Sequence, residues 1–277
     1  MTTSPPTIVI TSAGPTGMSA WRELWTARDL WWFLVWRDLK TRYIQSVLGL
    51  GWAVIQPLFT MGIFTIIFGK LAGVPSEGVP YAAFSLTAVV AWTFFQTVVT
   101  DASNSLTNNM GLVTKVYFPR LILPLASVTA RLMDLAIMLL MLALMLVLTH
   151  MQPSWNAVLA VPAALGVTLV SGAGLGLWLA GLGVQYRDVR YSQTLGLQLL
   201  MYASPVIYSA KQVPAKWQTF YSLNPLTGVI ESMRASLLGT GPVPWSTLGL
   251  DAFIALVLYA TGTWCFHRAV RIYADVA

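Results

Sequence analysis

The stretch RDLKTRYIQSVLGLGWAVIQP, residues Arg37–Pro57, joins a short basic segment to a long uncharged one. Its first six residues carry three cations and one carboxylate, whereas no charged residue occurs from Tyr43 to Gly69. Positive charge followed by about 20 apolar residues is the pattern of a chain that enters a bilayer from its basic side. The stretch therefore predicts a membrane protein whose first span begins here.

The residues just before this span have the period of an amphipathic helix. Large side chains that share one predicted face are Trp32, Val35, Trp36, Leu39 and Tyr43. Arg37, Lys40 and Thr41 fall on the other side. Tryptophan on one face and base on the other indicate a helix over residues 29–43 that lies in the headgroup plane. The alternative, an amphipathic helix packed on a soluble core, fits poorly with the uncharged run that follows.

The composition of the whole chain supports a membrane protein with several spans. Of its 277 residues, 56% are hydrophobic and 9% are charged, whereas a soluble domain has about 25% charged residues. The formal charge of +6 does not indicate a nucleic-acid partner, because the Lys and Arg residues lie between apolar runs rather than on one water-facing patch. The one cysteine, Cys265, can form no intrachain disulfide.

We predict an all-α polytopic membrane protein in which residues 21–277 form one transmembrane domain. Six apolar runs long enough to span a bilayer lie near residues 47–69, 81–103, 122–148, 157–184, 192–208 and 247–267. Residues 1–20 are rich in Thr, Ser, Pro and Gly and are predicted to be a disordered cytoplasmic tail.

The distribution of basic residues predicts the orientation. Twelve of the 16 Lys and Arg residues fall in segments on the side of the N-terminus. The other four are Lys70, Lys211, Lys216 and Arg234. Basic residues concentrate on the cytoplasmic side of membrane proteins, so both termini are expected in the cytoplasm.

The segment between the fifth and sixth spans is too apolar for a solvated loop. Prolines at 214, 225, 242 and 244 divide it. Two short helices are predicted near residues 215–222 and 226–238, re-entering the membrane edge from the outer face, because an apolar run of about 10–14 residues is too short to span. An ordinary outer loop is the alternative.

Motifs for catalysis and for cofactor binding are absent. The nearest approach to a Walker A motif, GIFTIIFGK at 62–70, has six residues between its glycines and is not a P-loop. The glycines at 172, 174 and 176 lie mid-span without a preceding strand and fit close helix packing. His150 and His267 are far apart in the chain and indicate no metal site. We predict a non-enzymatic chain with no cofactor of its own.

Charged residues inside the spans are few. Arg131 and Asp134 stand three residues apart in the third span, where they can pair. Asp101 lies near the inner end of the second span and Asp251 near the outer end of the sixth. Charges within spans mark function or structural pairing, and pairing is the interpretation favoured for Arg131 and Asp134.

Aromatic residues within the spans could line a path for a sliding sugar polymer, because the C–H faces of sugars stack on aromatic rings. Candidates for such a lining are Phe64, Phe68, Trp92, Phe95, Tyr202 and Tyr208. Contact with lipid or with another helix is the alternative for each of them.

Five motifs in a fixed order resemble the permease of bacterial polysaccharide ABC exporters, the group that handles O-antigen, capsule and teichoic acid. They are RDLKTRYIQSVLGLGWAVIQP, KVYFPRLILPL after span two, YRDVRY after span four, SPVIY at the end of span five and SLNPLTGVIESMR before span six. The resemblance covers the chain from about Trp21 onward. It implies a homodimeric channel in the inner membrane, driven by two copies of a separate ATPase that binds ATP and Mg. The implied substrate is a polysaccharide linked to a polyprenyl pyrophosphate lipid, with O-antigen as the preferred candidate.

The resemblance also implies roles for individual residues. Those expected to contact the ATPase are Lys115, Val116, Tyr117, Phe118, Pro119, Arg120, Arg187 and Asp188. Pro119 is expected to end a short helix there. Arg37, Lys40 and Arg42 are expected where the lipid pyrophosphate arrives. The residues assigned to outer gate helices at the channel exit are Asn224, Pro225, Glu231 and Arg234.

Other transport functions stay open at this point. Teichoic acid or capsule export fits the same resemblance. A small-molecule or multidrug exporter of the same fold would show a polyspecific apolar cavity. An ion- or proton-coupled transporter would show inverted repeats with broken helices, which the sequence does not display.

Overall fold

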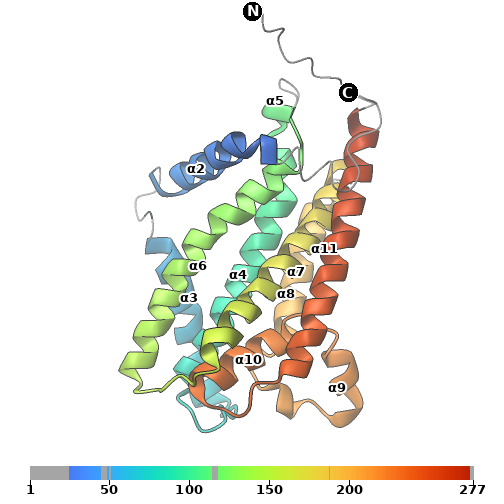
Figure 1. The fold of residues 1–277 in the computed structure, drawn as a ribbon. Helices are drawn as coiled ribbons and strands as arrows, with labels where there is room; N and C mark the ends of the chain where they lie inside the picture. Colours follow the sequence, from blue (N-terminus) through green and yellow to red (C-terminus); the bar gives the residue numbers. More distant parts are fainter. Residues whose placement is uncertain (1–24, 45–48, 50, 114–117, 187, 275–277) are drawn as a thin grey trace, which may run out of the picture.

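The computed structural model describes residues 25–44, 49, 51–113, 118–186 and 188–274, and within these ranges all regular structure is helical (Figure 1). The elements are α2 Arg28–Ile44, α3 Gly51–Phe64, the π-helical η1 Thr65–Leu71, α4 Tyr81–Asn108, α5 Met110–Val113, α6 Ile122–Leu148, α7 Ala157–Gln185, α8 Val189–Tyr202, the 3₁₀ turn η2 Ala210–Gln212, α9 Ala215–Tyr221, α10 Thr227–Leu238 and α11 Trp245–Ala274. The all-α prediction is confirmed for this part of the chain. The predicted tail, residues 1–20, lies outside the described residues.

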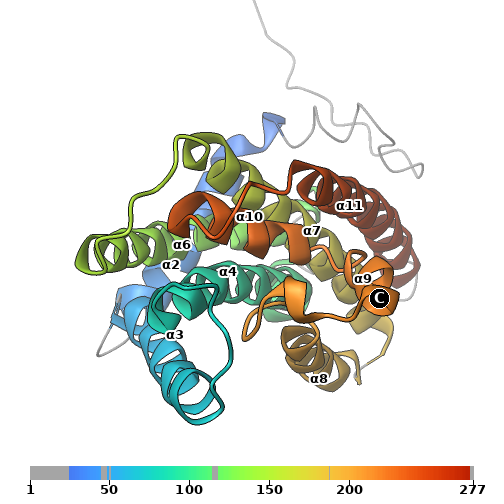
Figure 2. The same cartoon turned by 90° about the horizontal axis from the view of Figure 1, so that it is seen from below.

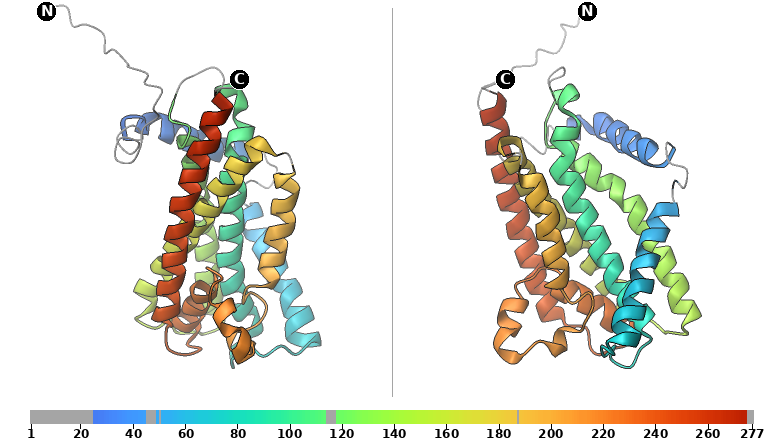
Figure 3. Two further views of the ribbon diagram at one scale, coloured as in Figure 1. Left: turned by 90° about the vertical axis from the view of Figure 1, so that its right-hand side faces the viewer. Right: turned by 180° about the vertical axis from the view of Figure 1, so that it is seen from behind.

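Among the described residues, five helices are long and apolar enough to cross a membrane: Gly51–Leu71, formed by α3 with η1, and α4, α6, α7 and α11. The long helices run side by side between two ends of the molecule (Figures 1 and 3). We call the end where α2 lies the basic end, and the end where α9 and α10 lie the far end. The basic end corresponds to the side that the Lys and Arg distribution predicts to be cytoplasmic.

The fifth predicted span, at 192–208, is not one long helix. α8 ends at Tyr202 after 14 residues, about 21 Å at 1.5 Å per residue, against a hydrocarbon core of about 30 Å. The cause is Pro205, which has no N–H to donate and whose ring would clash with the preceding turn of a continued helix. Turns carry the chain from Ala203 to η2 at the far end. In Figure 3, α8 stands alongside the bundle and covers only part of its length.

Close packing of α4, α7 and α11 forms the centre of the bundle. A Cβ added at Gly172 or Gly176 of α7 would lie 2.9 Å from Val98 or 2.5 Å from Ala102, both on α4. A Cβ added at Gly174 would lie 2.6 Å from the backbone nitrogen of Tyr259 on α11. The glycines thus face two neighbouring helices, which confirms their predicted role in close packing.

α2 crosses the basic end at an angle to the long helices (Figure 3). The helix predicted over residues 29–43 is confirmed as α2, and its predicted place in the headgroup plane stays a prediction. Trp32 and Trp36 are 62% and 67% exposed, whereas Leu34 and Val35 are 1% and 5% exposed and pack on the bundle. Polar partners on α4 and α6, described below, hold α2 in this position.

The far end is closed by the segment between α8 and α11. The predicted short helices near 215–222 and 226–238 are confirmed as α9 and α10. Viewed from this end, α10 lies across the bundle (Figure 2). It packs on α4, α7 and α11, and nearly all of its residues are buried. Gly239 follows α10 with φ +70°, the left-handed conformation that terminates many helices.

Candidate functional site

An ionic network of two arginines and two aspartates occupies the basic end. Arg42 of α2 contacts Asp101 of α4 at 2.7 Å and Asp134 of α6 at 3.0 Å. Arg131 of α6 contacts the same two carboxylates at 2.6 and 2.7 Å. The predicted pairing of Arg131 with Asp134 is confirmed, and the four residues form a charge-neutral ring that joins three helices. We refer to them as the ionic network.

The network is shielded from solvent, because the exposed fraction of its side chains lies between 9% and 25%. Removing one partner of such a pair leaves its neighbour with an uncompensated charge, which is strongly destabilising. Tyr43 adds a hydrogen bond from its hydroxyl to Asp134. Burial and the Asp134 carboxylate raise the pKa of Tyr43 to about 12, so this phenol remains a neutral donor at physiological pH.

The three basic residues predicted to meet a lipid head differ in their surroundings. Arg42 is engaged in the ionic network, and its predicted contact with a lipid head stays a prediction. Arg37 bonds to Asp38 at 2.8 Å and to Asn109, the residue just after α4, at 2.7 Å. Lys40 is exposed and has no ion pair among the described residues. On the surface of α2, Lys40 is therefore fully available to an anion, whereas Arg37 is only partly available.

Of the residues predicted to contact an ATPase, Lys115, Val116, Tyr117 and Arg187 lie outside the described residues. The carbonyl of Pro119 accepts from the N–H of Ile122 at 3.0 Å, so Pro119 leads into α6. The short helix predicted to end at Pro119 falls largely on residues 114–117, outside the described residues. Arg120 donates to the carbonyl of Val270 on α11 at 2.9 Å.

The other two described members of this set differ from each other. Phe118 packs on the apolar cluster at the basic end. Asp188 is exposed just before α8. Their predicted contact with an ATPase stays a prediction.

The aromatic residues proposed to line a path are not gathered on one surface of the chain. Trp92 and Phe95 are 3% and 1% exposed, inside the core around α4, and Phe64 is also buried, edge-to-face with Phe68 at 5.6 Å. Buried rings cannot stack on a passing sugar, so Phe64, Trp92 and Phe95 are corrected to core residues. Of the other three, Phe68 is half-buried and Tyr202 is exposed. The hydroxyl of Tyr208 donates to the carbonyl of Tyr202.

Arg234 of α10, one of the residues assigned to the outer gate helices, is fully buried, and its role at a channel exit stays a prediction. Its side chain is 0% exposed and donates to the carbonyls of Val206, Tyr208 and Phe84 at 3.0, 3.2 and 3.3 Å. The guanidinium also lies 3.5 Å from the ring centre of Phe84. Burial lowers the pKa of Arg234 to about 10, so it remains charged at neutral pH and satisfies carbonyls that the break after α8 leaves free.

The turn into α10 is fixed by Asn224, which precedes Pro225. The side-chain oxygen of Asn224 accepts from the N–H of Leu226 at 3.1 Å, and its amide donates to Ser204 at 2.8 Å. Residues 224 and 225 thus connect the end of α8 to the start of α10. Their predicted role at a channel exit is not tested by these contacts.

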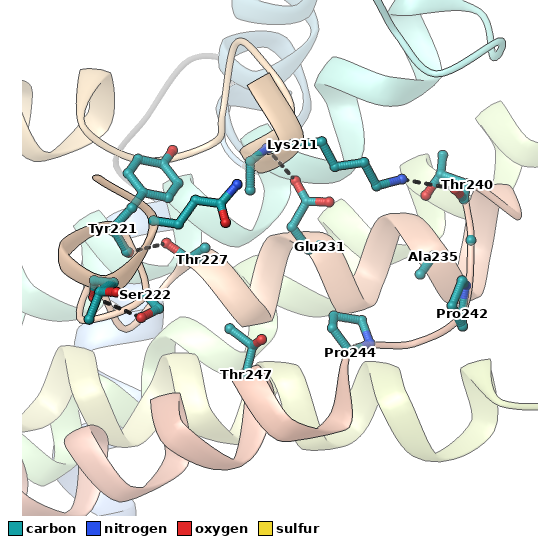
Figure 4. A pocket seen from close by; sticks show the side chains of 14 residues that line it. Lys211, Tyr221, Ser222, Thr227, Glu231, Ala235, Thr240, Pro242, Pro244 and Thr247 are labelled. Atoms are coloured by element: carbon teal, nitrogen blue, oxygen red, sulfur yellow. Dashed lines mark hydrogen bonds between the residues drawn. The ribbon is translucent and has the colours of Figure 1, made fainter. Parts of the chain in front are cut away.

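A cavity of about 550 Å³ opens at the far end, lined by η2, α9, α10 and the chain leading into α11 (Figure 4). We call it the far cavity. Glu231 reaches into it from α10 and accepts from the N–H of Ala210 at 3.0 Å. Lys211 spans one side, with Nζ 2.6 Å from Glu77 and 3.3 Å from the carbonyl of Thr240.

Sequence reasoning missed Lys211 and Glu77 as a pair. Both residues belong to the few charged residues predicted on the outer side. Their shared location and opposite charge are the one sequence signal that could have suggested the contact. The hydroxyl of Ser209 also bonds to Glu77. Although burial opposes the shift, the hydrogen bonds from Lys211 and Ser209 lower the pKa of Glu77 below its usual value.

Comparisons with known proteins agree with this architecture. The chain is 26% identical over 240 residues to an O-antigen export system permease protein RfbA of Klebsiella pneumoniae, covering 87% of this chain and 92% of that protein. It is 29% identical over 216 residues to the protein of that name from Myxococcus xanthus, covering 77% and 82%. It is 21% identical over 206 residues to the polysialic acid transport protein KpsM of Escherichia coli, covering 73% and 78%.

A family model matches most of the chain, from α2 through α10. The model described as ABC-2 type transporter matches residues 29–238, from the start of α2 to the end of α10. This range includes the ionic network and most of the wall of the far cavity. The chain therefore belongs to the ABC-2 type transporter family, as a multi-pass membrane permease that carries no ATPase domain of its own.

Proposed function

We propose that this permease is the membrane-channel subunit of an ATP-driven exporter of lipid-linked polysaccharide, of the O-antigen type. It moves a polymer carried on polyprenyl pyrophosphate from the cytoplasmic to the outer side of a bacterial inner membrane. Two copies of the chain form the channel, two copies of a separate ATPase drive it, and both termini are cytoplasmic. The proposal is supported by family membership and by the relatives, which include O-antigen export permeases and a polysialic acid transport protein.

The observation that carries the proposal is the position of α2. This helix crosses the basic end, and the ionic network and the bond from Arg37 to Asn109 hold it there. Lys40 and part of Arg37 remain at the membrane surface. An anionic lipid surface attracts each such cation by roughly 1 kcal/mol, and a pyrophosphate adds charge-assisted hydrogen bonds. A lipid-linked substrate would be received here before its polymer is moved.

A capsule polymer is the second candidate substrate, because one relative is a polysialic acid transport protein. Deletion of the gene followed by complementation tests the proposal. We expect loss of surface polysaccharide, with the lipid-linked polymer retained on the cytoplasmic side, and recovery with the wild-type gene. Inverted vesicles containing the permease and its ATPase should then take up the polymer only with ATP. Uptake of small apolar dyes without polymer uptake would instead indicate a small-molecule exporter.

A further inference from the structure

The far cavity has a charge-balanced wall. Its two charged lining residues, Lys211 and Glu231, are each paired already, Lys211 with Glu77 at 2.6 Å and Glu231 with Arg234 at 3.4 Å. A free cation would attract a phosphate or a carboxylate, and a free carboxylate would repel one. Because both charges are matched locally, the wall favours an uncharged occupant over a polyanion.

The wall also presents hydroxyl groups that are available for hydrogen bonding. Thr219, Thr240 and Thr247 line the cavity, and their hydroxyls make no hydrogen bond among the described residues. One oxygen of Glu231 takes both of that carboxylate's contacts, from Ala210 and Arg234, which leaves the other oxygen open. A carboxylate oxygen and several hydroxyls together suit a ligand rich in hydroxyl groups, since each hydroxyl both donates and accepts.

Apolar surfaces complete the cavity. Figure 4 shows Pro244 and Thr247 on one side of Glu231, with the Lys211 side chain on the other. Pro242, Ala235 and Tyr221 also contribute to the lining. Apolar walls with a few placed polar groups, enclosing about 300–1,000 Å³, are typical of small-molecule sites, and 550 Å³ accommodates a short oligosaccharide segment.

We infer that the far cavity is a binding site for an uncharged, hydroxyl-rich segment of the exported polysaccharide. The inference rests on the proposed function and narrows its substrate class to neutral glycans. The cavity lies at the opposite end of the bundle from α2 (Figure 1). The polymer therefore meets it after crossing, and binding there disfavours backward sliding between strokes of the ATPase.

The composition of the native polymer is the first test. We expect a repeat unit whose sugars carry no carboxylate or phosphate. A charged group in every repeat unit would overturn the inference, while transport of that polymer in the vesicle assay would leave the proposed function intact. Failure of polymer transport with a functional ATPase complex would contradict the proposed function itself.

Binding to the assembled transporter is the second test. The permease with its ATPase, in lipid nanodiscs, is titrated with end-labelled polymer released by mild acid from the host surface, and with oligosialic acid of similar length. We expect the neutral polymer to bind at least about tenfold more tightly. Thr219→Val and Thr247→Val each keep side-chain size and remove one hydroxyl, and each should weaken binding about 2- to 10-fold.

Thr60→Val on α3 makes the same chemical change away from the cavity, since the Thr60 hydroxyl bonds only to the carbonyl of Gln56 in its own helix. It should leave binding unchanged, and copurification of the ATPase checks that all three variants fold. Unaltered binding in both cavity variants would overturn the inference. So would equal or tighter binding of oligosialic acid.

Discussion

Arg131 on α6 and Asp101 on α4 are joined by two parallel hydrogen bonds, 2.6 Å from Nε to Oδ2 and 2.8 Å from Nη2 to Oδ1. This two-point contact fixes both the distance and the rotation of the two side chains. Asp101 also receives Arg42 of α2 at 2.7 Å. One carboxylate therefore holds the surface helix and two long helices in a single arrangement at the basic end.

Asp101→Asn should destabilise the permease, because Arg42 and Arg131 would then share one carboxylate. Hydrogen bonds to charged groups contribute about 1.5–3 kcal/mol, and we expect a loss in that range for the free energy of unfolding in mixed micelles. Asp29→Asn on α2 is the matched control, since that side chain is 96% exposed. Equal stability of the two variants would contradict a holding role for Asp101.

A charge exchange between residues 101 and 131 tests whether the two side chains interact directly. Asp101→Arg combined with Arg131→Asp keeps the pair but reverses it, so the double variant should be more stable than either single variant. Arg42 would then face a second guanidinium on α4 in place of a carboxylate, so recovery is expected to be partial. Additive loss in a double-mutant cycle would show that the two residues do not interact.

Arg37→Gln with Lys40→Gln should impair export without altering insertion. Each cation near an anionic surface contributes roughly 1 kcal/mol, so removing two should raise the half-saturation concentration for lipid-linked polymer about 30-fold in vesicles. Lys216→Gln on α9 removes a cation at the opposite end and is the control. Wild-type export by the double variant would mean that these charges only set topology.

Arg120→Gln separates two roles for that residue. Loss of its bond to the carbonyl of Val270 should increase hydrogen exchange at the end of α11, while the ATPase still copurifies. If the ATPase is lost with no change in exchange, Arg120 contacts the partner directly, as the resemblance implies.

Topology can be mapped with single cysteines in a Cys265→Ala background. Ser222→Cys at the far end should react with an impermeant maleimide in intact cells, because Ser222 lines the far cavity. Asp188→Cys at the basic end should react only after permeabilisation. Labelling of the Asp188 variant in sealed cells would reverse the orientation.

The contact between Glu77 and Lys211 should depend on pH. The pKa of Glu77 is lowered from 4.5 in the folded protein, so its stabilising contribution is complete above the unfolded value and is lost as pH falls through the lowered one. Glu77→Gln should reduce stability at neutral pH and converge with the wild type in acid. A difference that stays constant from neutral pH into strong acid would contradict this linkage.

The sequence alone determined the long helices and their order. The predicted ranges 122–148 and 157–184 agree with α6 and α7 to within a residue, because apolar length and the positions of polar breaks are local properties of the chain. The packing role of Gly172, Gly174 and Gly176 could be predicted for the same reason. The end of α8 at Tyr202 is also a local property, because Pro205 interrupts the apolar run at 192–208.

Tertiary structure decided which faces of these helices meet. Arg42 bonds to residues 59 and 92 positions away, and no local pattern specifies such partners. These contacts hold α2 in a rotation in which Leu34 faces the bundle and Trp36 is exposed. Similar long-range packing buries Phe95 in the core and places Arg234 against three backbone carbonyls. The physical reason is that a helix forms from interactions within a few residues, whereas its rotation about its axis depends on the side chains of other helices.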